Sequence, residues 1–156
     1  MRIYFRMAAI ALVVAGCDSR RIFEDNVEFQ NRSWKISEPA QFEFRIADRT
    51  KKYNLFLNIR NSLDYPFARI FVNYELRQQD SSLTKKMISE YLFDQKTGKP
   101  FGTSGIGDIY DHQFPILKDY SFIKEGTYKL KLDQFMRMDT IPGILAVGIR
   151  VEMANE

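Results

Sequence analysis

The chain has 156 residues, of which 23 are lysine or arginine and 20 are aspartate or glutamate, with one histidine and one cysteine. This length suits one domain with a sizeable hydrophobic core. The small charge excess and the scattered basic doublets argue against nucleic acid as a partner, and a single thiol excludes a disulfide within the chain.

The N-terminus has the pattern of a bacterial lipoprotein signal. Two arginines precede an apolar run at 7–14, and the sequence VAGC at 14–17 fits the lipobox, which needs small residues before the cysteine. The run is shorter than the roughly 20 residues that span a bilayer. We therefore expect residues 1–16 to be a signal peptide and Cys17 to carry lipid. The alternatives are an ordinary secretory signal with a chance cysteine and a buried free thiol.

Without the signal peptide the protein is almost neutral. The two arginines of the signal leave 21 basic residues against 20 acidic ones. Residues 17–26 are polar and are predicted to form a lipidated tether, whose Arg20 and Arg21 are placed to touch anionic headgroups. An anchor with several acyl chains holds a protein firmly on a membrane, because each buried CH₂ contributes about 0.8 kcal/mol.

From residue 27 onward the dominant hydrophobic period is two, which is typical of strands with one face on a core. Runs with this period lie at 42–46, 53–59, 70–76, 128–132 and 147–151, and KMISEYLF at 86–93 is a further predicted strand. Aromatic residues make up 14% of the chain, which suits strands with large buried side chains.

Turn residues separate these runs at near-regular spacing. They cluster at 61–66, 79–82, 97–100, 125–126 and 142–143. Seven to nine short strands with such breaks predict an all-β fold, an antiparallel β-sandwich of jelly-roll or immunoglobulin-like type, in one domain at 27–156. At most one short helix is expected, at 133–138. A parallel α/β fold would need long helical crossovers, which this pattern lacks.

The loop FGTSGIGDIYDHQF at 101–114 is the most suggestive candidate site, because it gathers glycines, two acids and the only histidine. The candidate residues are Gly105, Gly107, Asp108, Asp111 and His112. One interpretation is a partner-binding loop on a rigid scaffold. The structural alternative is that the glycines permit positive φ and the acids bond neighbouring amides.

Catalytic, metal and cofactor roles find little support in this loop. Its glycines do not follow a nucleotide-binding pattern, and no helix comes after them. In an extended segment Asp108 and His112 would lie on one face and Asp111 on the other, which is a poor metal site. The sequence therefore predicts no cofactor, no metal and no enzymatic activity, although 20 acidic residues allow many carboxylate pairs in a folded chain.

Trp34 and the turn Tyr65-Pro66-Phe67 are the aromatic candidates. Exposed aromatic rings stack on sugars, so Tyr65 and Phe67 are possible contacts for a glycan or another partner. The alternative, which we prefer, is that these rings cover the end of the core.

Several longer segments occur in a characteristic order. They are YNLFLNIRNSLDYPF at 53–67, GIGDIYDHQ at 105–113, GTYKLKLDQFMR at 126–137 and IPGILAVGIRVE at 141–152. Together with the lipobox cysteine, they make the chain resemble the GldH-type gliding-motility lipoproteins of the Bacteroidota. The resemblance covers nearly the whole mature chain.

This resemblance implies an outer-membrane lipoprotein that acts in cell movement, beside the machinery that moves or exports surface adhesins. It implies no enzymatic activity and transfers one functional residue, Cys17. The expected partners are the membrane, through the anchor, and other envelope proteins. Surface-exported lipoproteins of this phylum carry an acidic run after the cysteine, and the sequence DSRR at 18–21 departs from it, which favours the periplasmic face. The rival functions are a surface glycan-binding or nutrient-capture lipoprotein and a periplasmic hydrolase.

Overall fold

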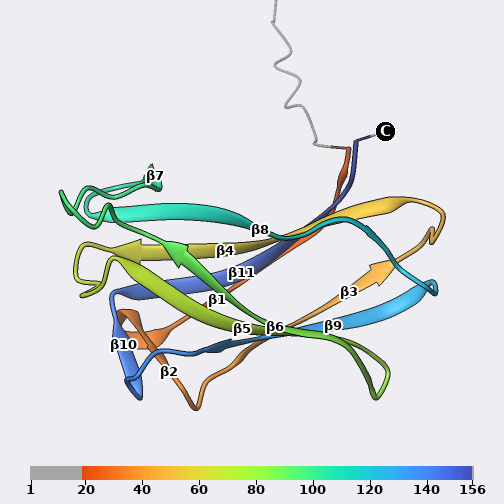
Figure 1. The fold of residues 1–156 in the computed structure, drawn as a ribbon, viewed down its shortest axis with the longest axis horizontal. Coiled ribbons are helices and arrows are strands. Elements are labelled where there is room, and N and C mark those ends of the chain that lie inside the picture. Colours follow the sequence, from red (N-terminus) through yellow and green to blue (C-terminus); the bar gives the residue numbers. More distant parts are fainter. Residues whose placement is uncertain (1–18, 156) are drawn as a thin grey trace, which may run out of the picture.

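A computed structural model of the chain describes residues 19–155, which form an antiparallel β-sandwich (Figure 1). The predicted signal peptide and Cys17 lie outside the described residues. One sheet has the strand order β1-β11-β4-β8-β7, the other has the order β3-β9-β5-β6, and β10 and β2 form a small ribbon. The predicted fold class is confirmed.

The strands of the larger sheet are, in spatial order, β1 (Arg21–Glu28), β11 (Ile144–Met153), β4 (Lys52–Ser62), β8 (Ile109–Ser121) and β7 (Thr103–Ser104). Those of the second sheet are β3 (Ala40–Ile46), β9 (Gly126–Gln134), β5 (Arg69–Gln78) and β6 (Ser81–Tyr91). The ribbon consists of β10 (Thr140–Pro142) and β2 (Ser33–Lys35). Within residues 19–155 the one helical element is the short 3-10 turn η1 (Gln30–Arg32).

The hydrophobic core lies between the two sheets, as the period of two requires. Along β4 the residues Tyr53, Leu55, Leu57 and Ile59 are each at most 2% exposed, while their neighbours face outward. Successive side chains of a strand point to opposite faces, so one face of each central strand is apolar. Aromatic rings fill one end of the core, where the centroids of Phe122 and Tyr128 are 4.5 Å apart.

The sheet begins earlier in the chain than the hydrophobic pattern suggested. β1 starts at Arg21 and pairs with β11 as far as the partners Glu28 and Ala146. Residues 21–26, which we predicted as tether, therefore belong to the sandwich. Their polar character reflects the position of β1 at the edge of its sheet, where only Phe23 and Val27 pack against the core.

The helix predicted at 133–138 is absent, and that prediction was wrong. β9 continues to Gln134, whose side chain then holds the following bend: its Oε1 accepts the Met136 amide at 2.8 Å and its Nε2 donates to the Met138 carbonyl at 2.7 Å. The Phe135 amide donates to the Phe71 carbonyl. These bonds replace the i to i−4 bonds that a helix would have made.

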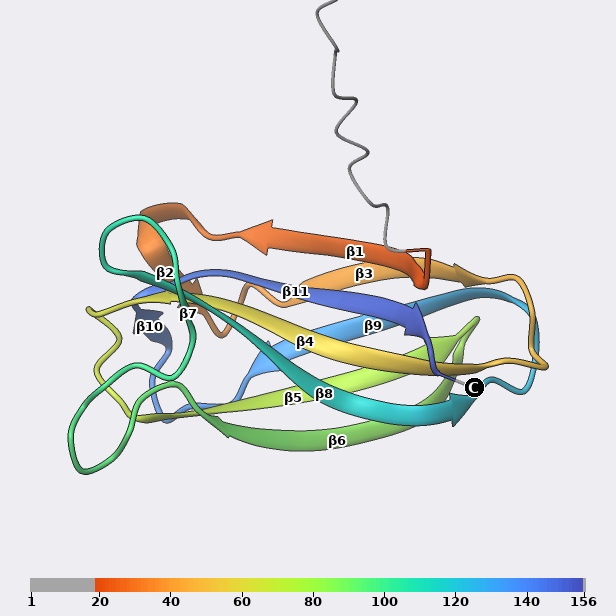
Figure 2. The ribbon, with the colours of Figure 1, turned by 90° about the horizontal axis from the view of Figure 1, so that it is seen from above.

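The two ends of the sandwich differ (Figures 1 and 2). The first and last described residues lie together at one end, because β1 and β11 are antiparallel neighbours. The opposite end carries the ribbon, β7 and the loops before β5 and β7. Within the described part of the chain, no helix reaches the length and apolar character needed to cross a bilayer.

Candidate functional site

Six of the fourteen residues of the predicted loop at 101–114 belong to strand β8, because it begins at Ile109. Asp111 lies on the outer face of the sheet opposite Arg60, and the Arg60 Nε to Asp111 Oδ1 distance is 2.8 Å. Hydrogen bonding to Asp111 raises the pKa of Arg60 further. Both side chains are nearly half exposed, and such surface pairs contribute at most about 1 kcal/mol.

Asp108 has a separate role at the start of β8. Its carboxylate lies 3.1 Å from an Arg32 guanidinium nitrogen, and its carbonyl accepts the Leu63 amide. Arg32 has φ +51°, in the left-handed region. The ion pair therefore connects the turn η1 to the loop before β8. Gly107, with φ +73°, and Gly105, whose amide donates to the Ile109 carbonyl, shape the same loop.

His112 points inward, away from Asp111. It is 7% exposed and stacks on Phe114, with ring centroids 5.5 Å apart. Its Nε2 has no hydrogen-bond partner among residues 19–155, and a Cβ on Gly102 would lie 2.7 Å from that atom, so only glycine fits over the ring. Burial lowers the pKa of His112 to about 4, against the opposing effect of Asp111. The imidazole is therefore neutral at physiological pH.

Asp108, Asp111 and His112 thus have three different sets of neighbours. The described residues contain no group of three or more His, Cys, Asp or Glu side chains placed to hold a metal ion. Among these three side chains, no base is hydrogen-bonded to a nucleophile, which is the arrangement typical of covalent catalysis.

The aromatic candidates mostly cover the core. Trp34 is fully buried, stacks on Phe29, and donates its Nε1 hydrogen to the Glu38 carbonyl at 2.8 Å. Tyr65 is 4% exposed and donates to the Arg69 carbonyl, and burial raises its pKa. Neither ring is free to stack on a sugar. Phe67, at 39% exposed, is the one accessible ring of this set.

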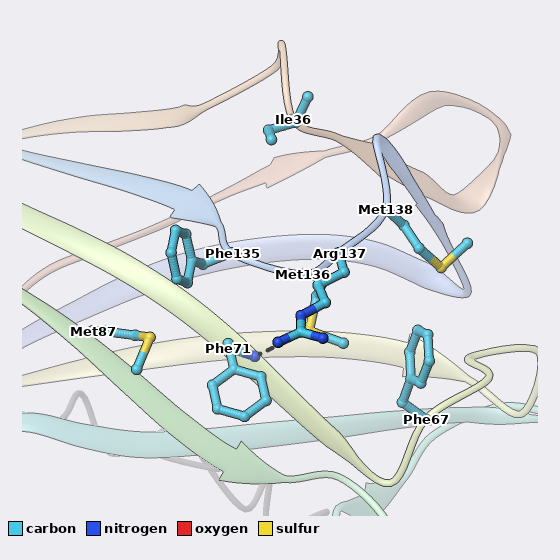
Figure 3. Close-up of a pocket in the computed structure, with 8 residues that line it drawn as sticks. All are labelled: Ile36, Phe67, Phe71, Met87, Phe135, Met136, Arg137 and Met138. Carbon is cyan, nitrogen blue, oxygen red and sulfur yellow. Dashed lines mark hydrogen bonds between the residues drawn. The ribbon is translucent and has the colours of Figure 1, made fainter.

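Phe67 belongs to a larger apolar groove that the sequence did not reveal (Figure 3). The groove has a volume of about 880 Å³, which is within the range of ligand sites. Its lining residues are Ile36, Phe67, Phe71, Met87, Phe135, Met136, Arg137 and Met138. Five of them are large apolar side chains with 39% or more of their surface exposed: Ile36, Phe67, Met87, Phe135 and Met138.

The groove lies where the outer face of the second sheet meets the bend after β9. Phe71 on β5 and Met87 on β6 point outward from the sheet, and the segment 135–138 passes beside them. The Met136 sulfur accepts the Phe71 amide at 3.4 Å, which fixes this segment against the sheet. In the sequence, the apolar segment FMRM at 135–138 is the sign of this groove. We assigned that segment to a helix, and so the groove was not predicted.

The model of the GldH lipoprotein family matches residues 21–151. The chain belongs to the GldH lipoprotein family. The match begins at the first residue of β1 and ends within β11, so it includes all or most of every strand of the sandwich. The resemblance found in the sequence motifs is confirmed.

Two relatives agree with this assignment. The gliding motility lipoprotein GldH of Flavobacterium johnsoniae is 30% identical over 152 residues, which are 93% of this chain and 92% of that protein. A GldH homolog of Christiangramia forsetii is 26% identical over 151 residues, which are 92% and 91% of the two chains. Membership of a lipoprotein family implies a membrane-anchored protein of the cell envelope.

Proposed function

We propose that this GldH family member is a lipid-anchored accessory component of the machinery for gliding motility and surface-protein export, and that it acts by binding. The observation that carries this proposal is the family match over nearly the entire sandwich. The relative from F. johnsoniae is named for gliding motility and aligns along nearly its full length.

The anchor in this proposal is a lipid on Cys17, at the periplasmic face of the outer membrane. Only four residue steps separate Cys17 from Arg21, where β1 begins. An extended chain covers at most about 3.5 Å per residue, so that the tether reaches roughly 14 Å. The end of the sandwich with the termini would therefore stay close to the bilayer, and the opposite end with the groove would face other envelope proteins.

The chemistry of the groove supports binding rather than catalysis. Its lining, as formed by residues 19–155, offers apolar surface and one guanidinium, and it includes no carboxylate, imidazole or thiol that could serve as a general acid or base. The loop at 105–112 and Phe67 lie at the same end of the sandwich and are further candidate contacts. The glycan-binding alternative loses support because Trp34 and Tyr65 are buried.

The test is conditional depletion of the protein in its own host. Colony spreading and the amount of exported protein in the medium are measured at a level of depletion that leaves the growth rate normal. We expect spreading or export to fall and to recover with the wild-type chain. Unchanged spreading and unchanged export would contradict the proposal and would favour a role outside motility.

A further inference from the structure

The groove gathers exposed large apolar side chains in one place. The described residues include eleven exposed large hydrophobic side chains, and five of these line the groove. Contiguous exposed apolar patches of this kind usually mark interaction sites. Methionine and phenylalanine make up six of the eight lining residues, and such flexible side chains adapt to apolar ligands.

The backbone around the groove determines which kind of ligand can bind. β5 is paired on both sides, with β6 and with β9, so that the open edge at the β6 side of this sheet lies on the far side of β6 from β5. The amides of Phe135, Ile36 and Phe71 are also occupied, by the Phe71 carbonyl, the Asp139 carbonyl and the Met136 sulfur. An extended peptide would find few free main-chain partners here, whereas a helix satisfies its own backbone and needs only side-chain contacts.

Arg137 gives the groove a positive charge, and Arg69, which is not among the lining residues, contacts the ring of Phe71. Arg137 projects between the lining rings and sulfur atoms (Figure 3), and within residues 19–155 it forms no ion pair. Arg69 lies over the rings of Phe71 and Tyr91, at 5.5 and 4.7 Å from their centroids. The nearby Asp133 already has a partner, Lys131. A ligand with a carboxylate would therefore complement Arg137.

We propose that the groove binds an amphipathic helix of an envelope protein, with apolar side chains spaced three or four residues apart and an acidic residue facing Arg137. That this partner is an envelope protein rests on the proposed function, whereas its apolar spacing and its acidic residue follow from the groove. An acyl chain fits less well, because Ile36, Met87 and Phe135 are more than half exposed and would leave much of it in water.

The proposal is tested first by photocross-linking in living host cells. The photoreactive p-benzoylphenylalanine replaces Phe135, and in the control strain it replaces Phe101, a surface phenylalanine outside the groove with almost the same exposure, 59% against 57%. We expect an adduct specific to position 135 whose sequenced peptide has a helical apolar period and an acidic residue. An adduct with lipid, an adduct with a second copy of this chain, or none specific to position 135 would overturn the proposal.

The second step is binding of the cross-linked peptide, made synthetically, to the mature lipoprotein in nanodiscs. We expect Phe135→Ser and Arg137→Glu each to weaken binding about 10-fold or more, and Phe101→Ser to change it less than 2-fold. A glutamine in place of the acid of the peptide should abolish the difference between the native protein and Arg137→Gln. Equal effects of Phe135→Ser and Phe101→Ser would refute the site.

The two proposals fail separately. If depletion stops colony spreading but a folded Phe135→Ser variant spreads normally, then the groove is not the working surface and the proposed function stands. If depletion leaves spreading and export unchanged while the peptide still binds in the groove, then the proposed function fails and the groove remains a helix-binding site.

Discussion

At the scale of single residues, His112 links the free energy of unfolding to pH. Burial lowers its pKa in the folded protein to about 4, whereas the unfolded chain has a value near 6.5. Between these values the unfolded state binds a proton that the folded state does not, so stability falls as the pH falls. We expect the free energy of unfolding to decrease from pH 6.5 to 4, with His112 contributing on the order of 2–3 kcal/mol, in denaturant titrations across that range.

The matched variant is His112→Leu, which has a similar volume and no titratable group. It also removes a buried nitrogen without a partner, so little or no loss of stability is expected at pH 7. The slope between pH 6.5 and 4 should become shallower. An unchanged slope would mean that carboxylates alone produce the acid sensitivity.

Gly143 occupies a position that no other residue fits. Its φ is +78°, and an added Cβ would lie 2.3 Å from the Tyr65 nitrogen and 2.6 Å from the Tyr65 Cα. Gly98 has a similar φ of +70° with no atom within 4 Å, so it isolates the cost of the backbone conformation. We expect Gly98→Ala to cost about 1 kcal/mol and Gly143→Ala at least about 3 kcal/mol in chemical unfolding. Equal losses would show that crowding by Tyr65 is not the cause.

At the scale of elements, β6 shows how the sandwich protects an open edge. Lys86 and Glu90 lie opposite the buried residues Tyr74 and Ile70, so both charged side chains point to the core side of the edge strand. Burial raises the pKa of Glu90, with Arg69 acting in the opposite direction. Inward-pointing charges of this kind oppose the pairing of edge strands between molecules.

Replacement of both charges, as Lys86→Val with Glu90→Val, should increase self-association, because it completes an apolar face on a strand with one open edge. Light scattering and sedimentation at increasing protein concentration measure the effect. The matched control is Lys85→Val on the outer face, which should leave the protein monodisperse. Equal association in the two variants would show that loss of charge alone increases self-association, whichever face of the strand the charged side chain points to.

The strands with strict alternation were predictable from the sequence, and β3, β4, β5, β9 and β11 lie where the apolar period placed them. β8, the longest strand, was not predictable in this way, because Pro115 and the glycines that precede the strand are typical of a loop. The structure accommodates Pro115 because β7 pairs with β8 only at residues 110 and 111, so that beyond them one side of β8 is an edge.

The candidate site was less predictable than the fold. The loop residues Asp108, Asp111 and His112 are close in sequence, but their partners Arg32, Arg60 and Phe114 depend on which strands become neighbours. The groove combines Ile36, Phe67, Met87 and the segment 135–138, which only the assembled sandwich brings together. The sign of the groove in the sequence is the apolar segment at 135–138, and a helix would explain that segment equally well.

At the scale of the whole molecule, the anchor and the folded domain should be separable. Cys17 precedes the first strand, so Cys17→Ser is expected to leave the melting temperature unchanged while the protein moves from the membrane fraction to the soluble fraction, with loss of palmitate labelling. Ser19→Ala is the control and should remain in the membrane fraction. Retention of Cys17→Ser on membranes would contradict lipidation at this cysteine.

The antiparallel pairing of β1 with β11 also determines how the molecule would bear force. A load between the N-terminal end and the groove end acts along β1, so the hydrogen bonds from Arg21 to Glu28 share it in shear. A load between the two termini instead separates β1 from β11 at the pair Arg21 and Glu152 and breaks the ladder one rung at a time. The same strand is therefore mechanically strong when the protein is pulled from its far end and weak when it is pulled by its C-terminus.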